Sequence, residues 1–599
     1  MDANPSIGLL ESVSNIFEVA AQYTGNECCM VSASPELQER IRAELEQLRS
    51  RVSVEHVASI LHLQEPSPLG MNDGVIYPLN YFPVGTPPQR IRSAAADRAP
   101  LQGRVRVIVV LVDFSDRPMS QSQQHFQDLF FSTGTLPNGS VKEYYTEVTN
   151  GLVTISGEVV GPYRLPRTLA EYAHGASGIG SSLPNAATMA QDAAQAANAD
   201  VDFSLYDNNG DGFVDAFIVI HSGPGAEVTG SNNDIWSHKW VLSSGAYNAD
   251  GTNIYAYLTV PEDSRIGVCC HELGHLLFGF PDLYDTDYSS SGVGNWCLMG
   301  GGSWNGGGDI PAHPSAWCKA NQGWVSTINQ TSNGSVTIQD VKNCHCVYRL
   351  WTNGASGNEY FLVENRQRTG YDRMLPGDGL LIWHIDESIP GNSDENHPKV
   401  ALLQADGRRQ LEVGINRGDS GDPFPGSSNN PNLTSSSNPN SRSYAGTVTQ
   451  VALTNISSSA PTMTARVRVS QRKSLLKDQV EDKRLTLDKA IQVDKRLGID
   501  KHSALDKPSE TRLPEPGTPA EQPGVTEHLV MEQPATRGDQ SRQPQLEPVL
   551  EPFIGSELRP DLGQSALLAE GDQEELRQQM AHTIARTKRL LYDTKNDGI

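Results

Sequence analysis

The distribution of apolar residues divides the chain into a mixed part and a strand-rich part. The most apolar stretch, VRVIVVLVDF at 105–114, is strand-length and rich in β-branched residues, so it predicts a buried strand. Residues 103–330 carry both strand and helix patterns, whereas strand patterns such as EYFLVENR and GLLIWHID dominate 331–470. We therefore expect an α+β fold whose second domain, 331–470, is an antiparallel β-sandwich-like structure.

Residues 1–102 predict a helical lead-in to this fold. The segment 35–63 has a Ser-Pro start, mixed charges and apolar residues at helical spacing. These apolar residues are Ile41, Leu45, Leu48 and Val52. Proline-rich sequence at 84–100 then marks a boundary before the first strong strand. The lead-in is a possible pro-segment.

The final part of the chain, 471–599, predicts a charged and largely disordered tail. Lys, Asp, Glu, Gln and Pro dominate there, and an apolar residue followed by Asp-Lys recurs every six residues between 487 and 507. Such a composition cannot bury enough apolar surface to fold. Near the end, one helical face carries Leu576, Met580, Ile584 and Leu591. We interpret it as a short amphipathic helix that docks on another part of the chain.

Composition and charge exclude several classes of function. The 599 residues are too many for one core, and 71 acidic against 47 basic residues give a net charge of −24. This field repels phosphate backbones, so nucleic acid is not an expected partner. The sequence contains no run of eighteen apolar residues, so no membrane span is predicted. The first thirty residues do not show the pattern of a secretory signal. The eight cysteines form no CxxC pair, which argues against a zinc ribbon and leaves the disulfide state open.

The sequence HELGHLLFGFPDLYD at 271–285 predicts a catalytic zinc site. His271 and His275 lie one helical turn apart and present their rings to a common point, with Glu272 beside them. Two neutral imidazoles bind Zn²⁺, and the carboxylate can accept a proton from water at the metal. The alternative is a pair of hydrogen-bonded core histidines. It is much less favoured, because the pattern is rare by chance.

A catalytic zinc needs a third protein ligand, which we assign to Asp282. Gly279 ends the helix, and Asp282 follows it at a Gly-x-x-ligand step. Asp285, three residues further on, is the alternative. In WCLMGGGSW at 296–304, Met299 lies in a glycine-rich turn that resembles the methionine turn beneath the zinc of metzincin-type proteases.

Oxygen-rich loops suggest calcium sites. The stronger candidate has the alternating oxygen ligands of an EF-hand-type loop, with Gly212 at its turn, but lacks the glutamate expected at position twelve. Its ligands are Asp207, Asn209, Asp211 and Asp215. The alternative is an ordinary turn between strands. Asp419 and Asp422 are weaker candidates, and a solvated turn accounts for them more simply.

Other polar residues remain open at this stage. Tyr284, Tyr288 and His313 are candidates for stabilising an oxyanion, but spacing does not choose among them. A thiolate of Cys28 or Cys29 capping the zinc is less favoured than a buried or disulfide-bonded pair. We interpret His221, His238 and His384 as core or rim histidines.

Several sequence blocks resemble the immune inhibitor A-like zinc metalloproteases, the sixth metallopeptidase family. Besides the zinc helix they are SVKEYYTEVTNGLVTISGEVVGPY at 140–163, DNNGDGFVDAFIVIHSGPGAE at 207–227, IWSHKW at 235–240, PSAWCKANQGW at 314–324, EYFLVENRQRTGYDRMLPGDGLLIWHID at 359–386 and GDSGDPFPG at 418–426. The resemblance covers roughly residues 100–470. One departure is an extra residue before Gly279, relative to the family's HExxHxxGxPD.

The resemblance implies an endopeptidase with a metzincin-like catalytic domain at 103–330, one catalytic zinc, bound calcium and an extracellular location. We therefore expect protein or peptide substrates, with Glu272 as general base and acid. One alternative is a surface-binding or adhesin-like protein with a vestigial protease domain, against which the intact HELGH argues. Another is a zinc hydrolase of a non-peptide amide, which would share the same site. Cleavage preference and oligomeric state are not predicted.

Overall fold

The computed structural model describes residues 29–51, 74–87, 90–91, 93–180, 182–286 and 288–471. Cys28, the predicted tail beyond 471 and its terminal helix lie outside the described residues. The described residues all belong to one structural unit, Met1–Gly498. None of the described helices is long and apolar enough to cross a membrane. The mixed α+β class is confirmed, because several sheets are combined with helices.

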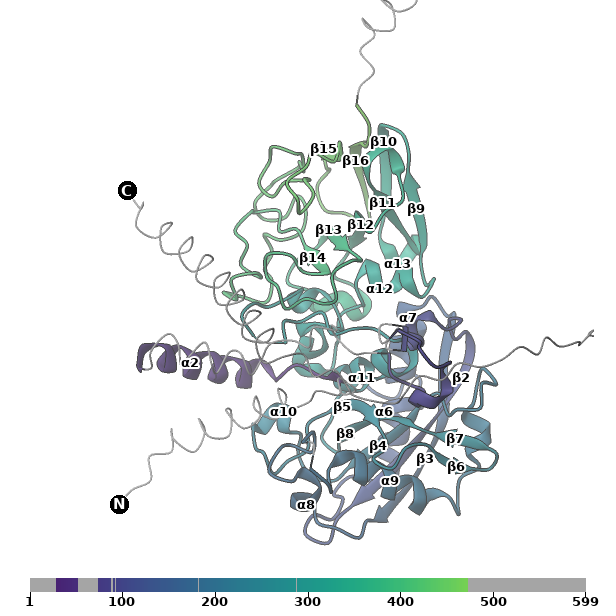
Figure 1. Cartoon of the computed structure of the whole chain (residues 1–599). Helices are drawn as coiled ribbons and strands as arrows, with labels where there is room; N and C mark the ends of the chain where they lie inside the picture. Colours follow the sequence, from purple (N-terminus) through teal and green to yellow (C-terminus); the bar gives the residue numbers. More distant parts are fainter. Residues whose placement is uncertain are drawn as a thin grey trace, which may run out of the picture. The chain divides into compact units, whose positions relative to one another are not determined.

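A six-stranded sheet forms the framework of the first part (Figure 1). In spatial order its strands are β1 (Cys29–Met30), β5 (His238–Val241), β8 (Ala256–Pro261), β4 (Phe217–His221), β2 (Gly103–Asp113) and β3 (Val153–Arg164). Strands β8, β4, β2 and β3 are parallel, whereas β5 and β1 are added antiparallel at one edge. Strand β2 confirms the predicted buried strand. Its residues 107–113 are all buried, as expected for a strand covered on both faces.

The helices pack against this sheet and against one another. They are α2 (Pro35–Arg51), α5 (Ala94–Asp97), α6 (Gln123–Phe131), α7 (Val141–Val148), α8 (Leu169–Ala173), α9 (Ala186–Ala197), α10 (Ala226–Thr229), α11 (Ile266–Phe278), α12 (Ala316–Asn321) and α13 (Val341–Cys344). Helices α6, α7 and α9 contact β3, whereas α11 contacts β5 and β8. A short hairpin of β6 (Tyr247–Ala249) and β7 (Thr252–Ile254) lies outside the main sheet.

The strand-rich part contains two further sheets. The larger has the order β14 (Val400–Leu402), β13 (Gly379–Asp386), β12 (Glu359–Arg366), β11 (Cys346–Leu350) and β9 (Ser326–Gln330). The smaller has the order β10 (Gly334–Gln339), β16 (Thr462–Arg468) and β15 (Ala452–Thr454). The strand pairs within 331–470 are antiparallel, as expected, whereas β9, which precedes the predicted boundary at 331, pairs in parallel with β11. The chain crosses over between them through β10 and α13, and a disulfide joins Cys344 to Cys346.

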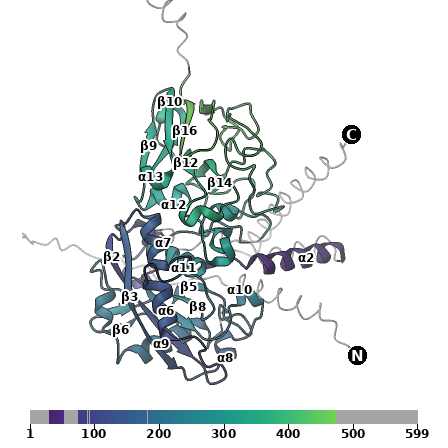
Figure 2. The same cartoon turned by 180° about the vertical axis from the view of Figure 1, so that it is seen from behind.

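Both faces of strand β13 in the larger sheet are buried. On β13, Leu381, Trp383 and Ile385 join the apolar cluster of the first part. The alternate residues, Leu380 and Ile382, join a second cluster shared with the smaller sheet. Side chains alternate across a strand, so this one strand serves two cores. The two parts therefore share their packing, and α7 and α12 lie where they meet (Figure 2).

A buried network of charges also crosses this junction. Lys319 Nζ of α12 lies 2.7 Å from Glu364 Oε2, and Arg366 lies 3.2 Å from the other oxygen of Glu364. Arg366 also pairs with Asp372, whose Oδ1 accepts a hydrogen bond from the His313 amide (3.0 Å). Burial opposes ionisation of Asp372, but Arg366 and then His313 lower its pKa far below its usual range. The four charged side chains are at most 1% exposed, so each depends on its partners.

Replacing Arg366 by Met should destabilise the folded chain by about 3–5 kcal/mol, because two buried carboxylates lose their shared cation. Urea denaturation followed by tryptophan fluorescence measures this change. Arg104→Met is the matched control, since Arg104 is exposed and bonds only Ser156 across the sheet surface. A loss below about 1 kcal/mol for Arg366→Met would show that the network contributes little.

Candidate metal centre

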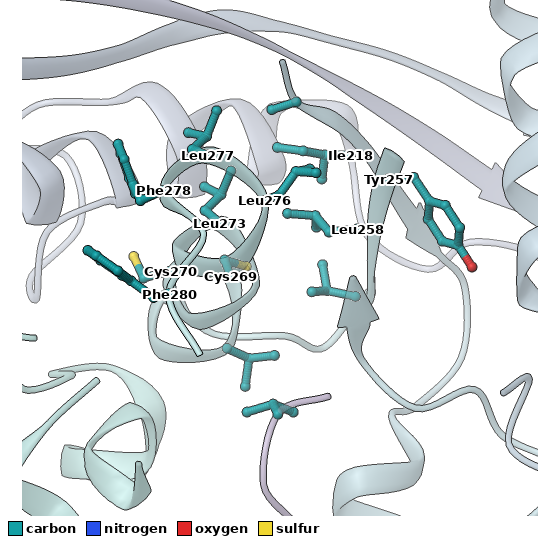
Figure 3. Packing of buried hydrophobic residues seen from close by; sticks show 14 of the residues in the cluster. Ile218, Tyr257, Leu258, Cys269, Cys270, Leu273, Leu276, Leu277, Phe278 and Phe280 are labelled. Atoms are coloured by element: carbon teal, nitrogen blue, oxygen red, sulfur yellow. The ribbon is translucent and has the colours of Figure 1, made fainter. Parts of the chain in front are cut away.

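Helix α11 carries two histidines and a glutamate in wholly apolar surroundings. Every residue of the helix is buried. Figure 3 shows Leu276 pointing toward Ile218 and Leu258 of the sheet, while Phe278 and Phe280 lie on the opposite side of the helix. A helix that is apolar on both sides is held in place by packing. Its polar side chains therefore have few other positions to adopt.

The end of α11 turns the chain back toward the histidines. Gly279 adopts a left-handed conformation (φ 65°), and a Cβ there would lie 2.5 Å from the Ala96 amide nitrogen. The Phe280 amide then donates to the Gly274 carbonyl (3.1 Å), as expected for a glycine-terminated helix. The extra residue before Gly279 is thus accommodated within the last turn. Asp282 follows directly on this turn.

Three ligand atoms meet beside the helix. Asp282 Oδ1 lies 3.0 Å from His271 Nε2 and 3.2 Å from His275 Nε2, and the two nitrogens are 3.1 Å apart. A tetrahedral zinc with bonds of about 2.0–2.1 Å places its ligands roughly 3.3 Å apart, so these atoms fit Zn²⁺. Asp285 does not join them, because its Oδ2 accepts hydrogen bonds from Ser289 and Ser290.

Backbone carbonyls orient the two imidazoles. His271 Nδ1 lies 3.1 Å from the Leu298 carbonyl, and His275 Nδ1 lies 2.5 Å from the Phe280 carbonyl. A proton held on Nδ1 leaves Nε2 free to bind a metal. Burial lowers the pKa of His275, which favours the same neutral form.

Glu272 is buried beside this group, and neither of its oxygens has a hydrogen-bond partner. Burial raises its pKa well above the usual range, Asp282 and Glu227 raise it further, and the nearby Val31 amide opposes the rise. A divalent cation bound nearby would lower the pKa of Glu272 and favour its charged carboxylate form. Glu272 is therefore a buried carboxyl group without a hydrogen-bond partner, next to a group of possible metal ligands.

The glycine-rich turn that contains Leu298 and Met299 packs against α11 beside the centre. A Cβ added at Gly274 of α11 would lie 2.8 Å from Met299 Sδ, so the sulfur packs directly on the helix. The neighbouring Leu298 carbonyl bonds His271, and the Met299 carbonyl accepts from the Leu283 amide (2.7 Å), next to Asp282. One turn thus braces both the helix and the segment that carries Asp282.

The three oxyanion candidates lie in different places. Burial raises the pKa of Tyr284 well above its usual range, and the charge of Asp282 raises it further. Burial also raises the pKa of Tyr288, to about 12, with a smaller contribution from Asp282. His313 instead pairs with Glu147 (2.9 Å) in the network at the junction. The histidines interpreted as core, namely His221, His238 and His384, are buried as predicted.

Residues 29–34 lie against α11 and the segment that follows it, a placement that the sequence indicated only through the less favoured thiolate of Cys28 or Cys29. Strand β1 pairs with β5 at the sheet edge and contacts α11. Indole nitrogens of Trp236 and Trp304 donate to the Val31 and Ser32 carbonyls (2.8 and 2.9 Å). The Tyr284 hydroxyl donates to the Met30 carbonyl (2.8 Å). We name Cys29–Ser34 the covering segment. Apart from that thiolate, its only signal in the sequence was a short run of small and apolar residues before α2.

The carboxylates of the loop predicted to bind calcium have partners both within the loop and outside it. Asp207 accepts hydrogen bonds from backbone amides of its own loop, Asp211 accepts from the Tyr77 hydroxyl (2.6 Å), and Asp215 pairs with Arg98 (3.1 Å). Among the described residues, these carboxylates do not form a close group of possible metal ligands. The calcium site at Asp207, Asn209, Asp211 and Asp215 therefore stays a prediction.

Comparison with known proteins finds that the region around the centre is similar to one peptidase family. Residues 98–329 match the family model "Immune inhibitor A peptidase M6, catalytic domain". The resemblance to this family is confirmed. The pre-pro-metalloprotease PrtV of Vibrio cholerae serotype O1 is 31% identical over 270 residues, which is 36% of this chain and 29% of that protein. Immune inhibitor A of Bacillus thuringiensis subsp. alesti is 30% identical over 271 residues, 36% of this chain and 39% of that protein.

The matched region holds the whole candidate centre but spans less than two fifths of either relative. Both histidines, Glu272 and Asp282 fall within 98–329, whereas most of the strand-rich part follows it. The likeness therefore applies to the region around the centre.

Asp282→Ala should lose bound zinc, whereas Asp285→Ala should retain it, because only Asp282 shares the oxygen–nitrogen triangle. Metal analysis after dialysis, with near-ultraviolet circular dichroism to check folding, makes the comparison. Retention of one zinc by Asp282→Ala together with loss by Asp285→Ala would reverse the assignment.

Proposed function

We propose that this chain is a zinc-dependent endopeptidase. The observation that carries the proposal is the buried triangle of His271 Nε2, His275 Nε2 and Asp282 Oδ1, within a region that matches M6 peptidases. Two imidazoles and one carboxylate favour zinc over calcium or magnesium, which prefer oxygen ligands alone. Three protein ligands leave a position for water or substrate.

The chain's own residues would perform most of the steps. When bound, the metal would lower the pKa of a water molecule and polarise the substrate carbonyl. Glu272 would accept a proton from the attacking water molecule and pass it to the departing amine. The Tyr284 hydroxyl, which donates to the Met30 carbonyl of the covering segment in this structure, would donate to the substrate carbonyl oxygen as it gains negative charge. The Leu298 and Phe280 carbonyls would accept the proton on each Nδ1 and so leave each Nε2 free to bind the metal.

Glu272→Gln should reduce turnover of casein at least about 10²-fold while retaining zinc, because the amide cannot accept the proton and the ligands are unchanged. Fluorescent casein hydrolysis and zinc analysis on the same sample measure both quantities. Unchanged proteolysis by the zinc-loaded variant would remove Glu272 from the mechanism. A wild-type chain that hydrolyses small amides but no protein would instead favour the non-peptide alternative.

The lead-in acts as a pro-segment in this proposal. Its covering segment is buried, extends the sheet at β5 and bonds Tyr284 and two tryptophans beside the ligands. A peptide substrate needs the same access to Glu272, so the covering segment must leave before hydrolysis. Helix α2 anchors it through Leu37 and Ile41, which are 2% and 3% exposed.

Leu37→Ala with Ile41→Ala should increase the proteolytic activity of the full chain several-fold, because the anchor of the covering segment is weakened. Initial rates on casein, measured before any self-cleavage, make the comparison. The matched control replaces exposed Glu36 and Glu39 of the same helix by Ala. Equal rates for the two double variants would show that the lead-in does not limit access.

Substrate and location complete the proposal. Proteins or peptides are the substrates, and the chain acts outside the cell, as the family resemblance implies. The adhesin-like alternative predicts a chain that holds no zinc, so the metal analysis above distinguishes it. A structural Ca²⁺ at 207–215 belongs to the proposal as an untested element.

A further inference from the structure

A second group of possible ligands lies in the strand-rich part, away from the elements that carry the histidines. One carboxylate oxygen from each of Asp406, Asp419 and Asp422 lies within 4.8 Å of the others. Backbone hydrogen bonds bring the two segments together: the Ala405 amide donates to the Asp422 carbonyl (2.8 Å), and the Asp406 amide donates to the Gly421 carbonyl (3.1 Å).

The Asp422 side chain is buried without a full set of partners. Its Oδ2 accepts hydrogen bonds from the Trp296 indole and from the Asp419 amide, both at 3.0 Å. Its Oδ1 is buried and has no hydrogen-bond partner, although Asp422 is 0% exposed. A buried carboxylate oxygen in this state is costly unless a cation or a proton satisfies it.

The surrounding protein supplies little positive charge. Among the described residues, the ion pair formed by this group is that of Asp406 with Arg408 (3.5 Å), whose side chain is 70% exposed. Burial raises the pKa of Asp422 to about 7, and repulsion from Asp419 and Asp406 adds to the rise. Three carboxylates thus converge on one point where the fold provides no buried counter-charge.

The geometry suits a calcium ion. Calcium binds oxygen ligands at about 2.4 Å, so two oxygens that share one ion lie no more than about 4.8 Å apart. The group contains only oxygen ligands, which argues against zinc. The backbone at Gly421 also comes close to it. A Cβ there would lie 2.9 Å from both Asp406 Oδ2 and Asp419 Oδ1, so only glycine leaves these oxygens in place.

We propose that Asp406, Asp419 and Asp422 bind a structural Ca²⁺ ion. This site is separate from the proposed zinc centre and from the loop at 207–215. It also holds a consequence for the zinc centre, because Trp296 bonds Asp422 and precedes the turn at Leu298 and Met299 that orients His271. Calcium would fix the loop at 418–426 against this turn and thereby stabilise the zinc ligands.

Terbium luminescence tests the site directly, since Tb³⁺ replaces Ca²⁺ and is sensitised by a nearby indole. The full chain carrying Glu272→Gln, loaded with zinc to prevent self-cleavage and to fill the first centre, is titrated with Tb³⁺ and then with Ca²⁺ as competitor. Thermal unfolding is followed in parallel with and without Ca²⁺, and Mg²⁺ serves as the control ion. We expect Ca²⁺, but not Mg²⁺, to raise the Tm by at least about 2 °C at saturation.

Single-residue variants test whether the Tb³⁺ luminescence and the Ca²⁺-dependent Tm arise from this site. Asp422→Asn should weaken the Tb³⁺ binding that is sensitised by Trp296 at least about tenfold and reduce the rise in Tm. Trp296→Phe should lose luminescence at this site while retaining a Ca²⁺-dependent Tm. Asp211→Asn, in the other predicted calcium loop, should retain the luminescence sensitised by Trp296, and Asp394→Asn controls for the loss of an exposed charge.

Two results would overturn the proposal. One is a wild-type Tm that does not respond to Ca²⁺. The other is an Asp422→Asn variant with unchanged Tb³⁺ affinity and an unchanged rise in Tm. If Asp422→Asn does not fold, Asp406→Asn at the partly exposed side of the site replaces it, with the same expected losses. None of these readouts depends on proteolysis, so the proposed peptidase function can fail independently.

Discussion

The close approach of two imidazole nitrogens and one carboxylate oxygen within a buried helix and its turn is the constraint on which this structure depends. These three atoms lie only 3.0–3.2 Å apart, and burying the polar groups that carry them is unfavourable unless a metal binds them. The surrounding fold serves this geometry. The sheet fixes α11, Gly279 returns the chain to Asp282, and the turn at Met299 supports both. The centre is thus a product of packing as much as of ligand identity.

The sequence predicted those features that depend on local periodicity. Helical spacing identified His271 and His275, and the run at 105–114 identified β2, because each pattern is set by neighbours along the chain. The choice of Asp282 over Asp285 rested on the glycine step, and the geometry at the helix end agrees with it. What local patterns could not supply was any contact between distant segments.

Three features illustrate that limit. The parallel pairing of β9 with β11 depends on a crossover, and the two-residue strand β1 finds its place only against β5. The oxygens at 207–215 follow a calcium pattern, yet the loop's own amides and Arg98 occupy several of them. Asp406 lies outside the pattern GDSGDPF, so the sequence identified only Asp419 and Asp422 as possible ligands in that region. Each outcome is decided by tertiary contacts, which composition and spacing do not encode.

The two-sided burial of β13 bears on how this architecture could change. A module that can be exchanged needs a surface that remains soluble when its neighbour is removed. Here Leu381, Trp383 and Ile385 would be left uncovered by loss of the first part, and the opposite face by loss of the smaller sheet. Recombination that separates the two parts would therefore leave an apolar face exposed, and such a face promotes aggregation. Inheritance of the two parts as one block avoids that exposure.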